Sequence, residues 1–224
     1  MSRPFDVRLP LELAYQRLVL FAIELLDAVT LSRITNGVKV VADGLEGKPT
    51  VNASGLFVWL KEDLANLRKI SIDPGQLPYE SLELTAAEVT TPLTTVQLQP
   101  RADYAFAAGV SGLRGSLIED RTSTPVVPVS DADVHLRWLD DNGVWQDAPT
   151  ISHTDKKRGD FVSIVRLNPT EVPDIDLGGN VTVRLHARRG SNERTSADFK
   201  LLQGRVMEPS TANTLTFAWD ELQP

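Results

Sequence analysis

The amino-acid sequence predicts an all-β protein with two β-sandwich domains in tandem. Its short apolar segments alternate with polar positions and are separated by turn residues, a pattern typical of sandwiches rather than of alternating strands and helices. The run 56–60, Leu-Phe-Val-Trp-Leu, is apolar at every position, as expected of a strand buried on both faces. A weaker copy occurs in the second half of the chain, where Gly159-Asp160-Phe161-Val162 aligns with Gly55-Leu56-Phe57-Val58.

The chain of 224 residues is long enough for two domains that each bury a core. The predicted segments are an N-terminal arm (1–17), a first sandwich (18–88), a linker (89–111), a second sandwich (112–203) and a C-terminal docking tail (204–224). The arm is either a short helix or an extended segment, because so few residues show no clear period. It either covers its own sandwich or reaches onto a neighbouring subunit.

Five strands are expected in the first sandwich. Phe21, Ile23 and Leu25 alternate with the residues between them, which predicts one apolar face for the opening strand. Turn signals such as Asn36-Gly37 and Asp43-Gly44 separate it from the later strands. The expected strands lie at 18–26, 38–42, 56–60, 67–72 and 81–84. The linker that follows is rich in Thr and Pro, and we expect one edge strand within it, at 96–99.

The second sandwich is expected to repeat this order with longer loops. Val134, Leu136 and Trp138 alternate with polar residues and predict a half-buried strand. A hairpin turn should follow, because Asn142-Gly143 readily adopts the positive φ of a tight turn. The expected strands lie at 112–118, 134–138, 144–145, 161–167, 181–187 and 197–202. The tail contains 214–219, Thr-Leu-Thr-Phe-Ala-Trp, a strand or docking segment too apolar to be left in water.

Matching motifs indicate that the two halves arose by duplication. Residues 25–30 resemble 117–122, and 38–40 resemble 134–136. The Gly-x-Phe-Val motif then follows in both halves in the same order. Two copies are fewer than the three or more repeats that a solenoid requires.

A strand that ends in Asp-x-x-Thr, a Val-x-Val strand and an Asn-x-Ser-Gly-x-Phe-Val segment follow one another in the first half. The residues concerned are Asp27, Thr30, Val38, Val40, Asn52, Gly55 and Phe57. This pattern resembles the carboxypeptidase regulatory-like, or transthyretin-like, β-sandwich family, over most of 18–84 and more loosely over 112–202. Two features depart from it: Leu31 replaces the usual Gly after the Thr, and 64–67 replace the Gly-x-Tyr closing element. The resemblance implies seven-stranded, Ig-like sandwiches that serve as accessory or interaction modules.

Composition argues against several classes of protein. A net charge of −7 does not suit a general nucleic-acid binder, and the absence of cysteine rules out disulfides, thiolate metal sites and cysteine nucleophiles. No apolar run reaches the roughly 20 residues of a membrane-spanning helix, so we expect no membrane insertion. The first residues lack a signal-peptide pattern, so we expect cytoplasmic synthesis, and a component released with a particle would look the same. We interpret the basic run Lys156-Lys157-Arg158 as a solvated hairpin tip.

No motif predicts a metal, a cofactor or a catalytic centre. His135, His153 and His186 are the only histidines of the sequence and lack zinc-ligand spacing. The carboxylate clusters at 131–133, 140–142 and 174–176 do not match a calcium loop, and Asx turns explain them. Neither a Gly-x-Ser-x-Gly motif nor a phosphate-binding Gly-rich loop is present. An acid pair brought together by folding stays open as a route to an enzyme.

Aromatic residues supply the candidate binding residues. Trp59 and Trp138 fall on predicted buried faces, so we expect them in the cores. Trp145, just after the Asn-Gly turn, is the candidate for an exposed ring. Phe217 and Trp219, in the apolar tail, are candidate docking anchors for another protein.

Three functions remain open at this point. The first is a non-catalytic structural or adaptor protein that joins other protein subunits, including copies of itself, in a larger assembly. The second is a carbohydrate- or ligand-binding module with an aromatic platform around Trp145, and the third is an enzyme with a carboxylate pair between the domains. We predict the first, because no catalytic or cofactor motif is present. A general resemblance to accessory proteins of phage tails and contractile injection particles implies an assembly of that kind, such as a virion.

Overall fold

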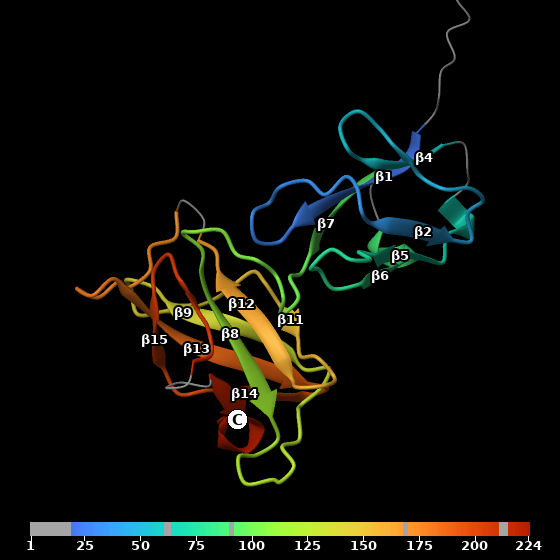
Figure 1. The fold of residues 1–224 in the computed structure, drawn as a ribbon. Coiled ribbons are helices and arrows are strands. Elements are labelled where there is room, and N and C mark those ends of the chain that lie inside the picture. The colour runs from blue at the N-terminus through green and yellow to red at the C-terminus, as the bar shows by residue number, and fades with distance from the viewer. Residues whose placement is uncertain (1–18, 61–63, 90–91, 168–169, 211–214) are drawn as a thin grey trace, which may run out of the picture.

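The computed structural model confirms the all-β prediction. It describes residues 19–60, 64–89, 92–167, 170–210 and 215–224 (Figure 1). The predicted N-terminal arm, 1–17, lies outside these residues. The helical segments among them are single 3-10 turns: η1 (Leu64–Asn66), η2 (Ala86–Glu88) and η3 (Trp219–Glu221). In the described part of the chain, no helix combines the length and the apolar character that a membrane crossing requires.

Two sheets enclose the first core. One sheet has the order β3-β4-β1-β7, with β1 antiparallel to β4 and parallel to β7; the other has the order β2-β5-β6. The strands are β1 (Val19–Asp27), β2 (Lys39–Asp43), β3 (Thr50–Val51), β4 (Phe57–Leu60), β5 (Lys69–Asp73), β6 (Leu82–Thr85) and β7 (Leu93–Leu98). The edge strand expected at 96–99 is thus the longer β7, and it belongs to the first sandwich rather than to a free linker.

The second sandwich also has two sheets. In one, β8 pairs with β12 on one side and with β16 and β17 on the other; in the second, β9 and β13 are central. The strands are β8 (Ser111–Ile118), β9 (Asp133–Leu139), β10 (Trp145–Asp147), β11 (Ser152–His153), β12 (Asp160–Val165), β13 (Asn180–Arg189), β14 (Asn192–Thr195), β15 (Phe199–Leu202), β16 (Val206–Met207) and β17 (Thr216–Ala218). The predicted docking tail, 204–224, therefore supplies two strands to its own sandwich.

The two sandwiches share one strand order, as the repeated motifs predict. β1 lies between antiparallel β4 and parallel β7, and β8 lies between antiparallel β12 and parallel β16 and β17. In the opposite sheets, β2-β5-β6 corresponds to β9-β13-β15. The second copy differs in having β10 and β11 beside β9, β14 beside β13, and two strands, β16 and β17, in the place of β7.

Each sandwich has its own core. In the first, Phe21 of β1 stacks on Trp59 of β4 with ring centroids 4.5 Å apart. Phe57, Val58 and Trp59 are all buried, which confirms that β4 is covered on both faces. Trp138 and Phe161 lie in the second core, where Trp138 is 1% exposed. Both tryptophans predicted to be core residues are core residues.

Buried hydroxyl groups close one side of the second sandwich. Ser163 Oγ of β12 accepts a hydrogen bond of 3.0 Å from Leu136 N of β9, the strand that faces it from the other sheet. Thr150 Oγ1 donates to Ile164 O (3.1 Å), and Ser152 Oγ lies 3.3 Å from Val162 N. Thr150, Ser152 and Ser163 are at most 1% exposed. We call these three residues the hydroxyl seam; they pair backbone groups that would otherwise form an open sheet edge.

Candidate functional site

An apolar cluster joins the two sandwiches. Val29, just after β1, Ile164 of β12 and Tyr104 of the connecting segment pack together in this cluster. All three side chains are buried. The Tyr104 ring also contacts Tyr79 and Phe106, with centroids 5.7 and 4.9 Å away. We call this cluster and its hydrogen bonds the joint.

A buried carboxylate lies at the centre of the joint. Asp27 is 3% exposed, and its Oδ1 accepts a hydrogen bond of 2.7 Å from Val29 N. Its Oδ2 accepts hydrogen bonds from Tyr104 Oη (2.5 Å) and from Thr30 Oγ1 (3.0 Å). Burial, together with the Asp27 carboxylate, raises the pKa of Tyr104 above its ordinary value and that of Tyr79 to about 12. The Asp-x-x-Thr motif therefore closes the turn after β1 and also holds Tyr104.

An arginine of the second sandwich completes the joint. Arg166, directly after β12, donates through Nη1 to Ala28 O and through Nη2 to Gln97 Oε1 at 3.4 Å. Ala28 follows β1, and Gln97 lies in β7. One side chain of the second sandwich thus contacts the C-terminal ends of both strands of a parallel pair in the first.

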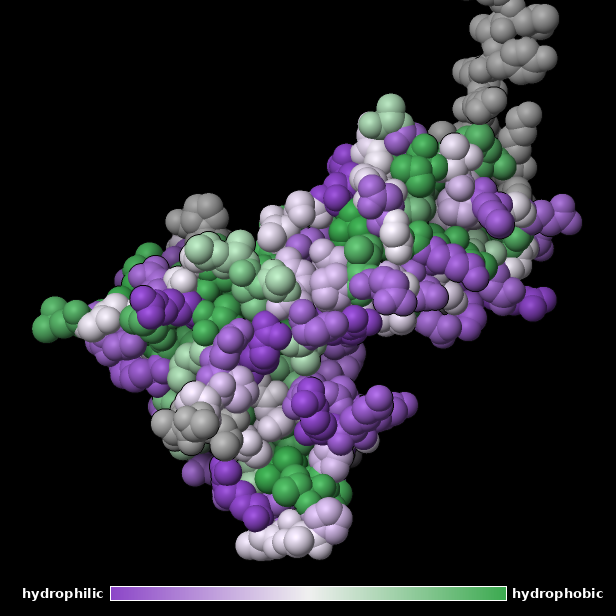
Figure 2. Space-filling model, in the orientation of Figure 1, coloured by the Kyte–Doolittle hydropathy of each residue, from purple (hydrophilic) through white to green (hydrophobic). Residues whose placement is uncertain are grey.

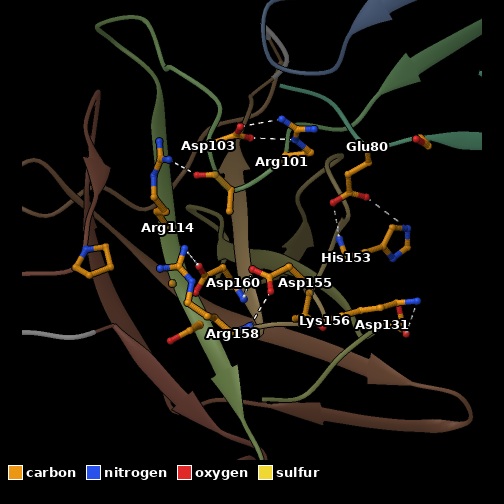
Figure 3. A pocket seen from close by; sticks show the side chains of 16 residues that line it. Glu80, Arg101, Asp103, Arg114, Asp131, His153, Asp155, Lys156, Arg158 and Asp160 are labelled. Carbon is orange, nitrogen blue, oxygen red and sulfur yellow. Dashed lines mark hydrogen bonds and ion pairs between the residues drawn. The ribbon is translucent and has the colours of Figure 1, made fainter. Parts of the chain in front are cut away.

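Beside the joint lies a cleft of about 1260 Å³ that is lined by both sandwiches and the segment between them (Figure 3). Hydrophilic side chains gather where the two sandwiches meet (Figure 2). The charged residues and the histidine that line the cleft are Glu80, Arg101, Asp103, Arg114, Asp131, His153, Asp155, Lys156, Arg158 and Asp160. Both signs of charge are mixed throughout, so the cleft has no uniform field for one class of ion.

Neighbouring charges in the cleft compensate one another. Arg101 Nη2 lies 2.8 Å from Asp103 Oδ2, and Arg158 Nη2 lies 2.6 Å from Asp160 Oδ2. Arg114 turns its guanidinium to the backbone, donating through Nη2 to Tyr104 O at 2.8 Å. Arg114 therefore supports the joint rather than presenting a free charge.

Two cleft carboxyl groups have raised pKa values. Burial raises the pKa of Glu80, which accepts a hydrogen bond of 3.1 Å from His153 N, and burial also raises that of Asp160. The His153 ring meanwhile lies 2.7 Å, through Nδ1, from Asp133 Oδ1. Glu80 and Asp160 thus have separate partners, His153 and Arg158, and do not form a pair that shares a proton. The arrangement can bind polar groups but does not single out an acid and a base.

The basic run Lys156-Lys157-Arg158 forms the exposed turn between β11 and β12, as predicted for a hairpin tip. Asp155 caps this turn, because its Oδ1 accepts hydrogen bonds from Lys157 N (2.6 Å) and Arg158 N (2.7 Å). Lys156 and Arg158 also line the cleft, which the sequence did not indicate.

The structure places Trp145 in β10, half-buried on the outer face of the second sandwich. The Arg184 guanidinium carbon lies over its ring, 3.4 Å from the centroid. One face of the indole is therefore covered by the protein itself. A role in sugar stacking would have to use the rest of the ring and stays a prediction.

Phe217 and Trp219 both contact their own sandwich. Trp219 is 6% exposed and belongs to the second core, with Arg189 and Arg194 over its ring at 4.7 and 5.2 Å from the centroid. Phe217 is half-buried, and its ring centroid lies 6.1 Å from that of Phe161 and 5.9 Å from that of Phe199. Phe217 therefore keeps an accessible part, whereas Trp219 does not. Their docking role stays a prediction.

The remaining histidines and the carboxylate cluster at 140–142 contact residues on their own or adjacent strands and turns. His135 and His186 face each other on the outer side of β9 and β13, with ring centroids 4.7 Å apart. Burial and the neighbouring His186 lower the pKa of His135. Asp140 caps its turn by accepting hydrogen bonds from Asn142 N (3.0 Å) and Val144 N (2.7 Å), as the Asx-turn interpretation predicts. Among the described residues, no group of three or more His, Asp or Glu side chains is placed to hold a metal ion.

Three residues of interest were missed in the sequence. Tyr104 and Arg166 meet Asp27 and Ala28 only through folding, so no local pattern reveals them. Leu177 does have a local signal. Asp176 and Gly178-Gly179 are typical turn residues, so the leucine between them is expected on an exposed turn.

Comparison of the chain with known protein families, with curated proteins and with solved structures found no match. The joint, the cleft and the exposed apolar side chains are therefore the features that bear on function.

Proposed function

We propose that this chain is a non-catalytic structural or adaptor protein that mediates protein–protein contacts in a larger assembly. The joint is the observation that carries the proposal. Domains of one chain usually move relative to each other unless a large, hydrophobic interface holds them. Here a buried carboxylate, Tyr104, Arg166 and an apolar cluster hold the two sandwiches together. A fixed spacing between two modules suits a protein that sets distances between its partners.

We further propose that both sandwiches are of the transthyretin-like, or carboxypeptidase regulatory-like, kind. Two observations support this. The first sandwich has seven strands in two sheets among its described residues, the number that the resemblance implies. Asp27 and Thr30 of the shared motif are hydrogen-bonded to each other at the end of β1. The accessory role of such modules agrees with an adaptor, and the proposed assembly is a particle such as a phage tail or a contractile injection particle.

The test is the native size of the chain in extracts of its source cells. An epitope-tagged chain is followed through gel filtration, with chemical cross-linking and mass spectrometry of the fractions. The proposal expects elution with other proteins, far above the 24.6 kDa of the single chain. Elution at the size of the free chain would overturn it.

Variants of the joint sharpen this test. Arg166→Ala removes the contacts to Ala28 and Gln97, and we expect it to lower incorporation into the complex. Arg101→Ala is the matched control, because Arg101 pairs with nearby Asp103 and its side chain is partly exposed, so this pair contributes little to stability. Equal incorporation of the two variants would show that the joint is not needed for assembly.

A further inference from the structure

A second contact between the two sandwiches lies at the cleft. Glu80, just before β6 in the first sandwich, and His153 of β11 in the second sandwich both line the cleft, and Figure 3 shows them side by side. Glu80 Oε1 accepts a hydrogen bond of 3.1 Å from His153 N. Glu80 Oε2 lies 3.9 Å from His153 Nε2 in the ring. We call this pair of residues the Glu80–His153 contact.

Asp133 determines which nitrogen of the His153 ring carries a proton. His153 lies opposite Asp133 in the pairing of β11 with β9, and its Nδ1 is 2.7 Å from Asp133 Oδ1. The other oxygen, Asp133 Oδ2, accepts a hydrogen bond of 3.0 Å from Arg188 Nε. A carboxylate paired with a guanidinium is an acceptor only, so His153 Nδ1 is the donor of the pair. In a neutral ring Nε2 is then an acceptor.

Two acceptors therefore face each other across the contact when His153 is neutral and Glu80 is ionised. Their separation of 3.9 Å is too long for a hydrogen bond. One added proton changes this, because either an imidazolium donates to the carboxylate or a carboxylic acid donates to the neutral ring. Each protonated form makes a hydrogen bond from one sandwich to the other that the deprotonated pair does not make.

Both groups are held in place by their own sandwich. Glu80 N donates to Gln99 O at 2.9 Å, just after β7, and the Glu80 side chain is only 17% exposed. The His153 ring is fixed by Asp133 but is 55% exposed, so it exchanges protons with the solvent. The contact thus combines a nearly buried carboxylate with an accessible imidazole.

The other charged groups around the contact are already compensated. Lys156 Nζ lies 3.7 Å from Asp131 Oδ2, and Arg101 Nη2 lies 2.8 Å from Asp103 Oδ2. Asp155, two residues after His153, accepts hydrogen bonds from backbone amides of its own turn. With Glu80, Asp133 and Arg188 charged and His153 neutral, the contact carries one net negative charge, and one proton neutralises it.

We propose that the contact between the two sandwiches is proton-linked: one proton taken up between His153 Nε2 and Glu80 Oε2 joins the sandwiches more firmly, and its loss loosens them. The proton belongs to the pair rather than to either residue. The inference deepens the proposed function and rests on it for its consequence, which is that pH regulates how firmly the spacing of the two modules is held.

The direction of the pH dependence follows from the surroundings of Glu80. Burial raises the pKa of Glu80 above its ordinary value of 4.5. The stabilisation of the joined form is therefore complete below pH 4.5 and is lost as pH rises through the raised pKa. Acid joins the sandwiches and alkali loosens them.

The experiment measures the distance between the sandwiches in the purified full chain by double electron–electron resonance. The sequence has no cysteine, so Lys48→Cys in the first sandwich and Ser191→Cys in the second, both at exposed positions, each accept one spin label. One proton changes the ratio of joined to loosened molecules by at most about tenfold per pH unit. Between about pH 5 and about pH 8, the fraction of molecules outside the main distance should at least double. The increase should be larger with Arg166→Ala, which weakens the joint.

Three further variants test the proton itself. Glu80→Gln places an amide donor opposite His153 Nε2 at every pH, so the distance distribution should stay narrow in acid and in alkali. Glu83→Gln is the matched control, because exposed Glu83 pairs with Lys69 of its own sandwich, and it should keep the wild-type response to pH. His153→Phe keeps a ring without nitrogen, so it should lose the response and give the broad distribution at both pH values.

Two results would overturn the inference. One is a distance distribution that ignores pH both in the wild type and with Arg166→Ala, and the other is a response to pH that Glu80→Gln and His153→Phe leave unchanged. Either result leaves the proposed function standing, because a chain with a pH-independent spacing still elutes with its partners from cell extracts. Elution as a free chain would instead refute the proposed function and leave the proton linkage, measured on the purified chain, intact.

Discussion

The two sandwiches share a strand order but end their first strand differently. In the first sandwich, the carboxylate that caps the turn after β1 is Asp27, which is buried and bonded to Tyr104. In the second, Asp120 caps the turn after β8 by accepting hydrogen bonds from Thr122 N (2.8 Å) and Ser123 N (2.6 Å). Asp120 is not buried, and hydrogen bonds from the Ser123 and Thr122 hydroxyl groups, together with these backbone bonds, lower its pKa to about 2.

This difference shows how one turn can serve two purposes. The cap alone needs a carboxylate and a few backbone amides, and both copies have them. Only the turn after β1 lies at the contact between the sandwiches, where Tyr104 donates to its carboxylate and makes it part of the joint. Contact between the two sandwiches therefore gives the turn after β1 a second role.

The largest effect is expected when the buried cap is removed. Asp27→Ala leaves the Tyr104 hydroxyl and Val29 N buried without their partner, so we expect a loss of about 3 kcal/mol of unfolding free energy. Asp120→Ala, the matched change in the second copy, should cost much less because water replaces the exposed cap. Urea unfolding followed by tryptophan fluorescence measures both. Equal losses would mean that the two turns do not differ as described.

Among the described residues of the first sandwich the hydroxyl seam has no counterpart, and β3 pairs along the edge of β4 instead. Ser163→Ala leaves Leu136 N buried without an acceptor, and we expect a loss of about 2 kcal/mol. Calorimetry should assign this loss to the second sandwich alone. Ser116→Ala is the control, since Ser116 is half-buried and its hydroxyl lies 3.3 Å from that of Thr216. A loss no larger than that of the control would contradict a structural role for the seam.

Tyr104→Phe separates the hydrogen bond of the joint from its apolar packing. The ring stays, the donor to Asp27 is lost, and we expect a loss of about 1.5 kcal/mol at neutral pH. Because the pKa of Tyr104 is raised on folding, the stabilisation is complete below the pKa of an unfolded tyrosine, about 10, and is lost as pH rises further. The difference between wild type and variant should therefore shrink in strong alkali. A double-mutant cycle with Asp27→Ala should show coupling, and simple additivity would refute the contact.

The smallest effect concerns two glutamates close in sequence. Burial raises the pKa of Glu80, so the stability it contributes is complete below its unfolded pKa and is lost as pH rises through its folded pKa. Glu80→Gln should therefore be neutral or stabilising by less than about 1 kcal/mol at pH 7. Glu83→Gln should act in the opposite direction, because Lys69 lowers the pKa of Glu83. Melting temperatures at several pH values test both, and a loss on Glu80→Gln at neutral pH would contradict this account.

Much of the fold follows from the sequence because alternation and turn residues are local signals. β1, β9 and β13 are long enough to show their period, and their expected positions agree with the structure to within two or three residues. β3, β11 and β16 have two residues each and carry no period, so they were missed. β7 was shortened and placed in a linker because a Thr-rich segment gives no sign that it pairs with β1.

The candidate site was predicted less well, for a physical reason. The cleft collects residues from 80–81, 101–103, 114–116 and 153–156, with Arg158 and Asp160, and only the fold brings these together. Trp145 follows a hairpin turn, as expected, but a cation from β13 covers it, and no sequence spacing encodes that contact. Asp27 was singled out by a motif, whereas its partner Tyr104 could not be.

The hydroxyl seam also bears on how the second sandwich exchanges its amide protons with water. Leu136 N lies in the gap between the short edge strands β10 and β11. Because it donates to the buried Ser163 Oγ, its proton should exchange only in rare, extensive openings of the sandwich. On the opposite side, β15 and β17 flank an apolar groove. The backbone amides there should exchange through smaller fluctuations. The second sandwich should then open locally on the side of β15 and β17, while the side closed by the hydroxyl seam stays intact.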